Sequence, residues 1–371
     1  MQKSVSVLIK PASSGCNIAC RYCFYHSIAG TRKIANYGVM SEQQAEILVK
    51  EIIAYAQEYA CFAFQGGEPT LAGLDFFEKI IQLQQKYNQK NIIIQNTIQT
   101  NGTLIDDKWA EFLAKNKFLV GLSLDGPRGI NDFCRVTGQG DSIFDKVMNT
   151  IELFEKYEVD FNVVSVVTNK SADRVSAIYN FFKRKGFHYL QFIPCLDEKY
   201  GEHGAYSLMP EAYGTFLCRL FDLWYEDFSK GLKIDIRMFS NLAQMAAGYA
   251  PEECGMCGKC NTYFVVESDG SVYPCDFYTQ DEWKLGGVED GFSNLYKSEK
   301  SMTFMKISQE VKKECRNCQY FYLCRGGCRR WRDRKLDGRL EVNYLCEGYK
   351  IFFAHCESRI KRLGEYIRRR G

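Results

Sequence analysis

Three cysteines near the beginning of the chain have a spacing that suits an iron–sulfur cluster. Cys16, Cys20 and Cys23 form the pattern C-x3-C-x2-C. Three thiolates can hold one face of a [4Fe–4S] cube and leave the fourth iron without a protein ligand. An open coordination position of this kind is typical of a catalytic metal site. A zinc site that lacks its fourth ligand, or a chance spacing, is the alternative interpretation.

A pair of glycines follows the second predicted strand. The string Gln65-Gly66-Gly67-Glu68-Pro69 comes directly after residues 62–64. Paired glycines let the backbone approach a ligand closely and expose its polar groups. Taken alone, such a string is more often a turn.

Residues at or beyond the ends of later strands are weaker candidates for ligand contacts. They are Ser123, Asp125, Arg135 and Leu196. Taken alone, each is more often a turn or packing residue. The string Gln99-Thr100-Asn101-Gly102 also ends a predicted strand, but Asn-Gly is mainly a turn signal.

A second group of cysteines lies in the last third of the chain. Its nine members are Cys254, Cys257, Cys260, Cys275, Cys315, Cys318, Cys324, Cys328 and Cys346. Nine residues suit two four-cysteine sites with one cysteine left over. Because C-x2-C is also a zinc spacing, two structural zinc sites are the alternative to iron–sulfur clusters.

The cysteine content also indicates the compartment. Seventeen cysteines in 371 residues are too few for a small disulfide scaffold and too many for an ordinary cytosolic enzyme. We find no signal peptide at the N-terminus and no apolar run long enough to span a membrane. We therefore expect a cytoplasmic protein whose clustered cysteines bind metal. The net charge of +3 gives no indication of a nucleic-acid partner.

Alternating strands and helices must position these residues. Strands are predicted at residues 5–9, 62–64, 92–99, 119–124, 161–167 and 189–193, and the helices between them near 41–59, 74–87, 107–116, 144–157 and 172–185. This order predicts parallel βαβ units in an α/β fold. A partial barrel and an open doubly wound sheet both fit the pattern, and both place ligands at the C-terminal ends of the strands.

Two predictions concern the details of these elements. The helix that begins at Ser41 has a capping-box start, and its apolar face is predicted to be Leu48, Ile52, Ala56 and Tyr59. Residues 205–250 are expected to form a helical bridge, followed by short strands and turns and a final helix at 349–369.

The C-x3-C-x2-C spacing resembles the signature of the radical S-adenosylmethionine superfamily. The resemblance implies that the open iron chelates the amino and carboxylate groups of S-adenosylmethionine. It further implies adenine contacts from Tyr22 and Leu196, a methionine contact at the Gly67 motif, and ribose or carboxylate contacts from Ser123 and Arg135.

The second group of cysteines resembles a SPASM domain, which carries two auxiliary [4Fe–4S] clusters. The resemblance implies that Cys254, Cys260, Cys275 and Cys328 hold one cluster. Cys315, Cys318, Cys324 and Cys346 then hold the other, and Cys257 is a fifth candidate for the first set. With the N-terminal motif, the tally is three clusters on eleven cysteines. A cysteine beside one cluster that ligates another has a precedent in two-cluster ferredoxins.

Longer strings are similar to those of the anaerobic sulfatase-maturating enzymes. They are KPASSGCN before the first cluster, CFYH after it, AFQGGEPTLAG, LQFIPCLD and VVESDGSVYPCDFY. Membership implies oxidation of an active-site Cys or Ser in an unfolded sulfatase to Cα-formylglycine without dioxygen. A 5′-deoxyadenosyl radical takes a hydrogen atom from Cβ. Loss of a proton and of an electron to an auxiliary cluster completes the oxidation.

The family resemblance also implies a base, an electron donor and domain limits. Asp276 follows Cys275 and is the implied base, although an aspartate there could equally cap a turn. A flavodoxin or ferredoxin is the usual donor. We expect a partial (β/α)6 TIM-like barrel with its bridge at 1–236, a SPASM domain at 237–346 and a C-terminal helix at 347–371. Residues 197–252 match no motif.

Two other functions fit the same residues. Related SPASM enzymes form thioether or carbon–carbon crosslinks in ribosomal peptides, which would keep the radical chemistry and change the product. A zinc-bound scaffold without catalysis is the interpretation from a different class.

Overall fold

The computed structural model describes residues 4–197, 203–333 and 339–369, and these residues form two compact units. The first unit contains the described residues up to Ser123, Asp132–Phe161 and Asn261–Phe304. The second contains Leu124–Asn131, Asn162–Cys260 and the described residues from Met305 onward. Each unit therefore combines segments that are far apart in the sequence.

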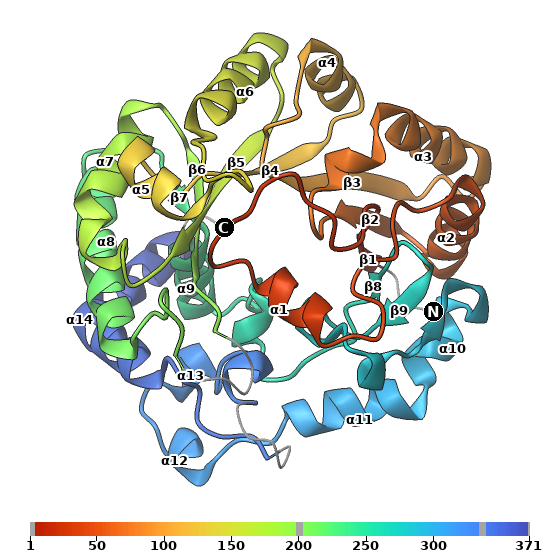
Figure 1. Cartoon of the computed structure of the whole chain (residues 1–371). Coiled ribbons are helices and arrows are strands. Elements are labelled where there is room, and N and C mark those ends of the chain that lie inside the picture. Colours follow the sequence, from red (N-terminus) through yellow and green to blue (C-terminus); the bar gives the residue numbers. More distant parts are fainter. Residues whose placement is uncertain (1–3, 198–202, 334–338, 370–371) are drawn as a thin grey trace. The chain divides into compact units, whose positions relative to one another are not determined.

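Parallel strands in chain order form the sheet of the first unit (Figure 1). They are β1 (Ser4–Ile9), β2 (Tyr59–Phe64), β3 (Ile93–Thr100) and β4 (Leu119–Ser123). Each strand pairs in parallel with the next. A doubly wound sheet would reverse the strand order part-way. The observed order is therefore that of the predicted barrel type.

Amphipathic helices connect these strands and pack their apolar faces against the sheet. They are α2 (Glu42–Tyr55), α3 (Leu74–Tyr87), α4 (Asp107–Lys115) and α6 (Phe144–Tyr157). In α2, Leu48 and Ile52 are fully buried. Ser41 caps this helix, because its hydroxyl oxygen accepts the N–H of Gln44 at 3.2 Å.

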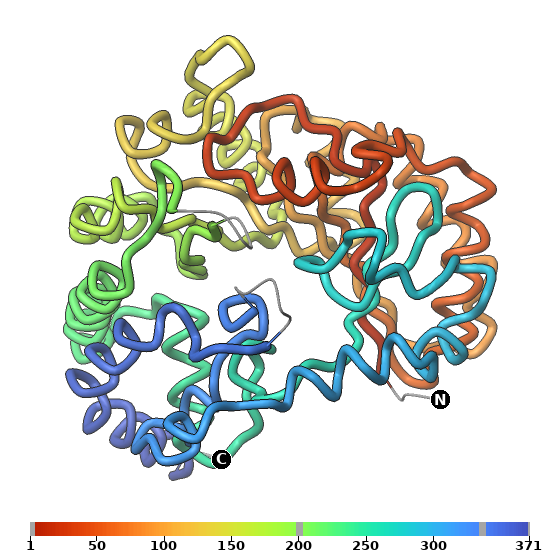
Figure 2. Tube along the Cα trace, turned by 60° about the horizontal axis from the view of Figure 1, so that its bottom comes forward, coloured from red at the N-terminus to blue at the C-terminus, as the bar shows by residue number. Residues whose placement is uncertain are grey.

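The last segment of the first unit returns to the first strand. β8 (Val265–Val266) pairs in parallel with β1, in register Leu8↔Val265. β9 (Ser271–Tyr273) and β10 (Gly286–Gly287) extend this edge in antiparallel fashion. Figure 2 shows the cyan segment that follows residue 260 beside the red N-terminal segment. The pairing brings residues after β8 next to residues after β1.

The second unit has its own parallel strands and a group of helices. The strands are β5 (Phe161–Val167), β6 (Tyr189–Pro194) and β7 (Asp235–Ile236), and the longer helices are α7 (Val175–Arg184), α8 (Pro210–Ser229), α9 (Arg237–Ala247) and α14 (Cys346–Arg368). α14 packs against α8 and α9. Phe352 of α14 lies 6.0 Å from Phe221 and 5.8 Å from Phe239 between ring centroids.

Short helices complete both units. They are α1 (Phe24–Gly30), α5 (Arg128–Cys134), α10 (Phe292–Lys297), α11 (Glu299–Ser308), α12 (Lys313–Arg316), α13 (Phe321–Cys324), η1 (Pro69–Ala72), η2 (Ala172–Arg174), η3 (Cys254–Met256), η4 (Asp276–Tyr278), η5 (Asp281–Trp283), η6 (Val288–Asp290) and η7 (Arg329–Trp331). No helix within the described ranges is both long and apolar enough to cross a membrane.

The structure confirms the six predicted strands and corrects one helix. The predicted helices at 74–87 and 144–157 match α3 and α6. The helix after Ser41 ends at Tyr55, and Ala56 already has extended backbone at its C-cap. Tyr59, predicted on the helix face, is instead the first residue of β2, where it pairs with Ile93. Strand pairing therefore overrides the helical spacing there. β7 also interrupts the predicted helical bridge, and α14 begins at Cys346, before the predicted start at 349.

Candidate active site

The first three cysteines lie on the loop between β1 and α1, in the first unit. This loop is tied to the last residue of α5 and to Val136, two residues further on. The N–H of Ala19 donates to the carbonyl of Val136 at 2.8 Å, and that of Arg21 donates to Cys134 at 3.0 Å. We call residues 10–23 the cysteine loop. Burial raises the pKa of Cys16 to about 11, and the nearby Cys23 contributes to the shift. A thiol with such a raised pKa loses its proton readily only beside a cation, and a bound iron would supply that charge.

The glycine pair lets two backbones approach closely. The N–H of Gly67 donates to Ser13 at 3.0 Å, and that of Glu68 donates to Gly15 at 2.7 Å. A Cβ at Gly67 would lie only 1.9 Å from the carbonyl oxygen of Gly15. The glycine is therefore required to hold the loop that carries Cys16.

A buried carboxylate links the glycine motif to the end of β3. Oε1 of Glu68 accepts the hydroxyls of Thr70 and Thr100, both at 2.7 Å, and Oε2 accepts the N–H of Asn101 at 2.7 Å. Burial raises the pKa of Glu68. The Asn101 amide in turn donates to Asn17 at 2.9 Å and lies 3.8 Å from Cys16 Sγ. Asn101 thus supports the cysteine loop, besides marking the turn that the sequence indicated.

Four predicted cofactor contacts lie in the first unit, namely Gly67, Tyr22, Ser123 and Arg135. Ser123 ends β4 and accepts the Gln99 amide at 3.0 Å. The guanidinium of Arg135 is buried, lies 5.5 Å from the Tyr22 ring and approaches Cys20 Sγ at 3.9 Å. Arg135 and Tyr22 are therefore neighbours at the loop. Leu196 lies in the second unit, two residues beyond the end of β6.

Asp276 lies beside Lys10, the first residue of the cysteine loop, and Tyr25 of α1, although it is far from both in sequence. The Tyr25 hydroxyl donates to its Oδ2 at 2.6 Å, and Lys10 Nζ lies 2.9 Å from its Oδ1. Gln65 donates to the Tyr25 hydroxyl at 2.9 Å. The charge of Asp276 also adds to the burial that raises the pKa of Cys23. The partners of the carboxylate are side chains, so it does not act as a cap on the turn that follows.

The sequence motifs did not identify three of these residues, Lys10, Tyr25 and Gln65, as site residues. Each lies inside a string that carried the family resemblance, next to a cysteine or a glycine motif. The sequence feature that could have identified them is therefore the length of the matching strings, which extend beyond the cluster ligands.

The second unit contains seven of the predicted cluster ligands, which form two groups. Cys254 belongs with Cys260 and Cys328, since their charges, together with burial, raise its pKa to about 12. Cys324, Cys315 and Cys346 form the other group with Cys318, because the pKa of Cys324 is raised by burial and then by Cys315 and Cys318.

The surplus cysteine also has a defined place. Cys257 lies near Cys254, and its Sγ is 3.7 Å from the carbonyl oxygen of Glu253 and 3.8 Å from that of Pro251. Cys257 is therefore a neighbour of Cys254, as Cys260 and Cys328 are. Cys275 belongs to the first unit.

The grouped cysteines are available as ligands. All seventeen cysteines are free, so none is removed from these groups by a disulfide. A cubane cluster binds its thiolates at separate corners, so a group of cysteines can hold one.

Comparison with known proteins identifies the class. Residues 11–182 match the radical SAM superfamily, and residues 251–319 match SPASM, an iron–sulfur cluster-binding domain. The protein is therefore a radical SAM enzyme with an α/β core and a SPASM domain. The SPASM match also favours iron–sulfur clusters over the zinc alternative.

Individual relatives narrow the family. The chain is 50% identical to a cysteine-type anaerobic sulfatase-maturating enzyme of Clostridium perfringens, over 98% of this chain and 99% of the relative. It is 35% identical to a serine-type enzyme of Bacteroides thetaiotaomicron, over 95% and 89%. A solved structure of native anSMEcpe with bound AdoMet and Cp18Cys peptide matches with a TM-score of 0.94 at 50% identity, over 98% and 99%. The chain belongs to the anaerobic sulfatase-maturating enzymes.

Proposed function

We propose that this protein oxidises the active-site cysteine of an unfolded sulfatase polypeptide to Cα-formylglycine without dioxygen. The cysteine-type relative is 50% identical, whereas the serine-type relative is 35% identical, which supports cysteine as the substrate residue. In the structure, the observation that carries the proposal is the position of Asp276, held by Tyr25 and Lys10 beside the cysteine loop.

The cofactors of this proposal are three [4Fe–4S] clusters and S-adenosylmethionine. We assign Cys16, Cys20 and Cys23 to the first cluster. The grouping of thiols in the second unit supports Cys254, Cys260 and Cys328 as members of one auxiliary set, and Cys315, Cys318, Cys324 and Cys346 as the other. Cys275 is assigned as the fourth ligand of the first auxiliary set on the family resemblance alone. When bound, these cofactors would supply a 5′-deoxyadenosyl radical and an acceptor for one electron.

The proposed contacts to S-adenosylmethionine are those that the family resemblance implies. Gly67 would meet the methionine end, because its motif already packs on the cysteine loop. Ser123 and Arg135 would bind ribose or carboxylate, and Tyr22 and Leu196 would lie against the adenine. The proximity of Arg135 to Tyr22 supports part of this set.

Asp276 would accept the proton that the substrate must lose. Oxidation of the cysteine removes one hydrogen atom and one proton from the side chain, together with one electron, and gives a thioaldehyde. Water then replaces sulfur with oxygen and releases hydrogen sulfide. A positioned carboxylate base typically contributes about 10²–10⁴-fold to such a step.

The mass of the product tests the proposal. The anaerobic enzyme would be incubated with S-adenosylmethionine, a reductant and a sulfatase-derived peptide that contains the target cysteine. Formylglycine requires that the peptide loses two hydrogens and exchanges sulfur for oxygen. A product that loses two hydrogens, keeps its sulfur after hydrolysis in water and does not react with a hydrazine reagent would instead indicate a crosslink and contradict the proposal, because a thioaldehyde would hydrolyse and would react.

The Asp276→Asn variant tests the role of the base. The amide keeps the shape of the carboxylate and removes its basicity. The variant should keep its iron, bind peptide and cleave S-adenosylmethionine, while formylglycine falls by about 10²–10⁴-fold. Formylglycine at the wild-type rate would exclude the role, and loss of iron would show that Asp276 is structural.

The proposal also includes an electron donor and a compartment. A flavodoxin or ferredoxin would supply the reducing electron. Seventeen free cysteines suit a reducing compartment, which supports a cytoplasmic location.

A further inference from the structure

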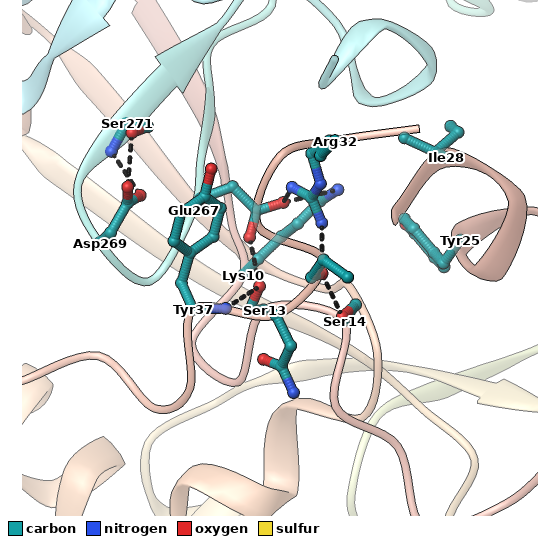
Figure 3. Close-up of polar contacts among 12 residues, drawn as sticks. Lys10, Ser13, Ser14, Tyr25, Ile28, Arg32, Tyr37, Glu267, Asp269 and Ser271 are labelled. Carbon is teal, nitrogen blue, oxygen red and sulfur yellow. Dashed lines mark hydrogen bonds and ion pairs between the residues drawn. The ribbon is translucent and has the colours of Figure 1, made fainter. Parts of the chain in front are cut away.

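A row of buried charges runs from Glu267 to Asp276 within the first unit. Arg32 donates to Oε1 of Glu267 at 2.6 Å, and Lys10 Nζ lies 3.4 Å from the same oxygen. Lys10 then lies 2.9 Å from Asp276. The side chains of Arg32 and Lys10 are each 2% exposed, and that of Glu267 is 0% exposed. Figure 3 shows Arg32, Ser13 and Lys10 converging on Glu267.

Glu267 is held at both oxygens of its carboxylate. Its Oε2 accepts the hydroxyl of Ser13 at 2.9 Å, so both carboxylate oxygens have partners. Burial alone would raise the pKa of Glu267, but the charges of Lys10 and Arg32 outweigh burial and hold that pKa below its usual value. Two cations and two carboxylates balance in the row, which is the condition for burying ionised groups.

The surroundings of Lys10 leave its side chain little freedom. Its backbone N–H is held by the carbonyl of Val266 at 2.8 Å. A Cβ at Gly66 would lie 3.0 Å from Lys10 Cγ, so the stem is packed against the glycine motif. Its Nζ lies over the Tyr25 ring, 4.7 Å from the centroid. The ammonium is therefore directed at Asp276 by backbone, stem and charge together.

We propose that Lys10 is a positioning residue, held by Glu267 and Arg32, which fixes the orientation of the Asp276 carboxylate toward the substrate. The inference rests on the proposed function, in which Asp276 takes the substrate proton. Lys10 holds Oδ1 and Tyr25 holds Oδ2, so the carboxylate cannot rotate freely. The remaining lone pairs can accept the proton. Because a misplacement of about 1 Å can cost about 10²-fold in rate, this fixation has a kinetic consequence.

The ratio of 5′-deoxyadenosine to formylglycine tests the inference. In Lys10→Met the stem remains and the charge is lost. S-adenosylmethionine should still be cleaved, while formylglycine falls by about 10–10²-fold, so the ratio rises by the same factor. Lys10→Arg should recover part of the product. Lys183→Met is the matched control, because Lys183 pairs with Asp227 at 2.7 Å in the second unit. Its ratio should equal that of the wild type.

A double variant separates positioning from a general loss of structure. If Lys10 acts through Asp276, Lys10→Met should have no further effect on the ratio in an Asp276→Asn background. Additive effects, or a wild-type ratio in Lys10→Met, would overturn the inference. Peptide affinity and the thermal unfolding midpoint of each variant report on structure independently of product.

A second variant covers the case in which Lys10→Met does not fold. Glu267→Gln removes the charge that holds Lys10 and should raise the same ratio by a smaller factor. An unchanged ratio in this variant would also contradict the inference. The proposed function fails separately: in that case the wild type makes no formylglycine, or Asp276→Asn makes as much as the wild type.

Discussion

The contact between Gly67 and Gly15 gives a prediction whose magnitude follows from the structure. In Gly67→Ala, the new Cβ would lie 1.9 Å from Gly15 O, 2.6 Å from Gly15 C and 2.7 Å from Ser14 C. Ordinary contact begins at 3.4 Å, so the two backbones must separate by 3.4 − 1.9 = 1.5 Å. All three obstructing atoms are backbone, so no flexible side chain can yield instead.

The displaced loop carries the first cluster ligand. Gly15 directly precedes Cys16, and a shift of about 1 Å in a reacting group can cost about 10²-fold. We therefore expect cleavage of S-adenosylmethionine to fall by at least about 10²-fold in Gly67→Ala. Overpacking of this kind typically destabilises a protein by about 1–3 kcal/mol, so the variant should still fold.

The assay is anaerobic 5′-deoxyadenosine formation with a chemical reductant, alongside iron content and thermal unfolding. Gly30→Ala is the matched control, since Gly30 ends α1 in the same unit and a Cβ there meets no atom within 4 Å. Cleavage at the wild-type rate in Gly67→Ala would show that the loop tolerates the displacement, and the reasoning would be wrong. Loss of all iron would show that the substitution also disturbs parts of the protein beyond the cysteine loop.

Three further predictions test the cysteine groups and the buried charges. Replacing Cys16, Cys20 and Cys23 by Ala should leave about eight of about twelve irons and abolish 5′-deoxyadenosine formation; normal cleavage would mean that the first cluster is misassigned. Cys324→Ala and Cys328→Ala should change the spectra of different auxiliary clusters, and identical changes would contradict the interleaved assignment. In urea unfolding, Glu267→Gln should lose about 3 kcal/mol at neutral pH. Because the pKa of Glu267 is lowered from 4.5, this difference should shrink as the pH falls through the lowered value; a difference that is independent of pH would contradict the charge network.

The parts of the fold that the sequence predicted have strong local signals. β-branched runs followed by amphipathic segments gave all six strands of the parallel sheet, because burial imposes those patterns on consecutive residues. The cluster cysteines were also predictable as candidates, because ligands of one cluster recur at short spacings. By contrast, β8 and β10 are two residues long, too short for any periodicity to appear.

The neighbours of Asp276 could not be derived from local pattern. Lys10 follows a β-branched run and precedes a proline, which is an ordinary sequence for the end of a strand. Tyr25 belongs to a short helix. Their contacts to Asp276 join residues 251 positions apart in the case of Tyr25. Only the folded chain brings such residues together, so spacing rules cannot identify them.

The register of β8 against β1 explains why these distant residues meet. Ile9 pairs with Val266 in a parallel ladder, so Lys10 and Glu267 are the next positions on the two strands. The N–H of Lys10 donates to the carbonyl of Val266, which fixes this step. Successive side chains of a strand point to opposite faces, so a shift of one residue would direct Glu267 away from Lys10. The turn through Gly270, at φ +83°, then starts β9 and leads to Asp276. The same edge pairing therefore sets both the charge that holds Lys10 and the carboxylate that Lys10 contacts.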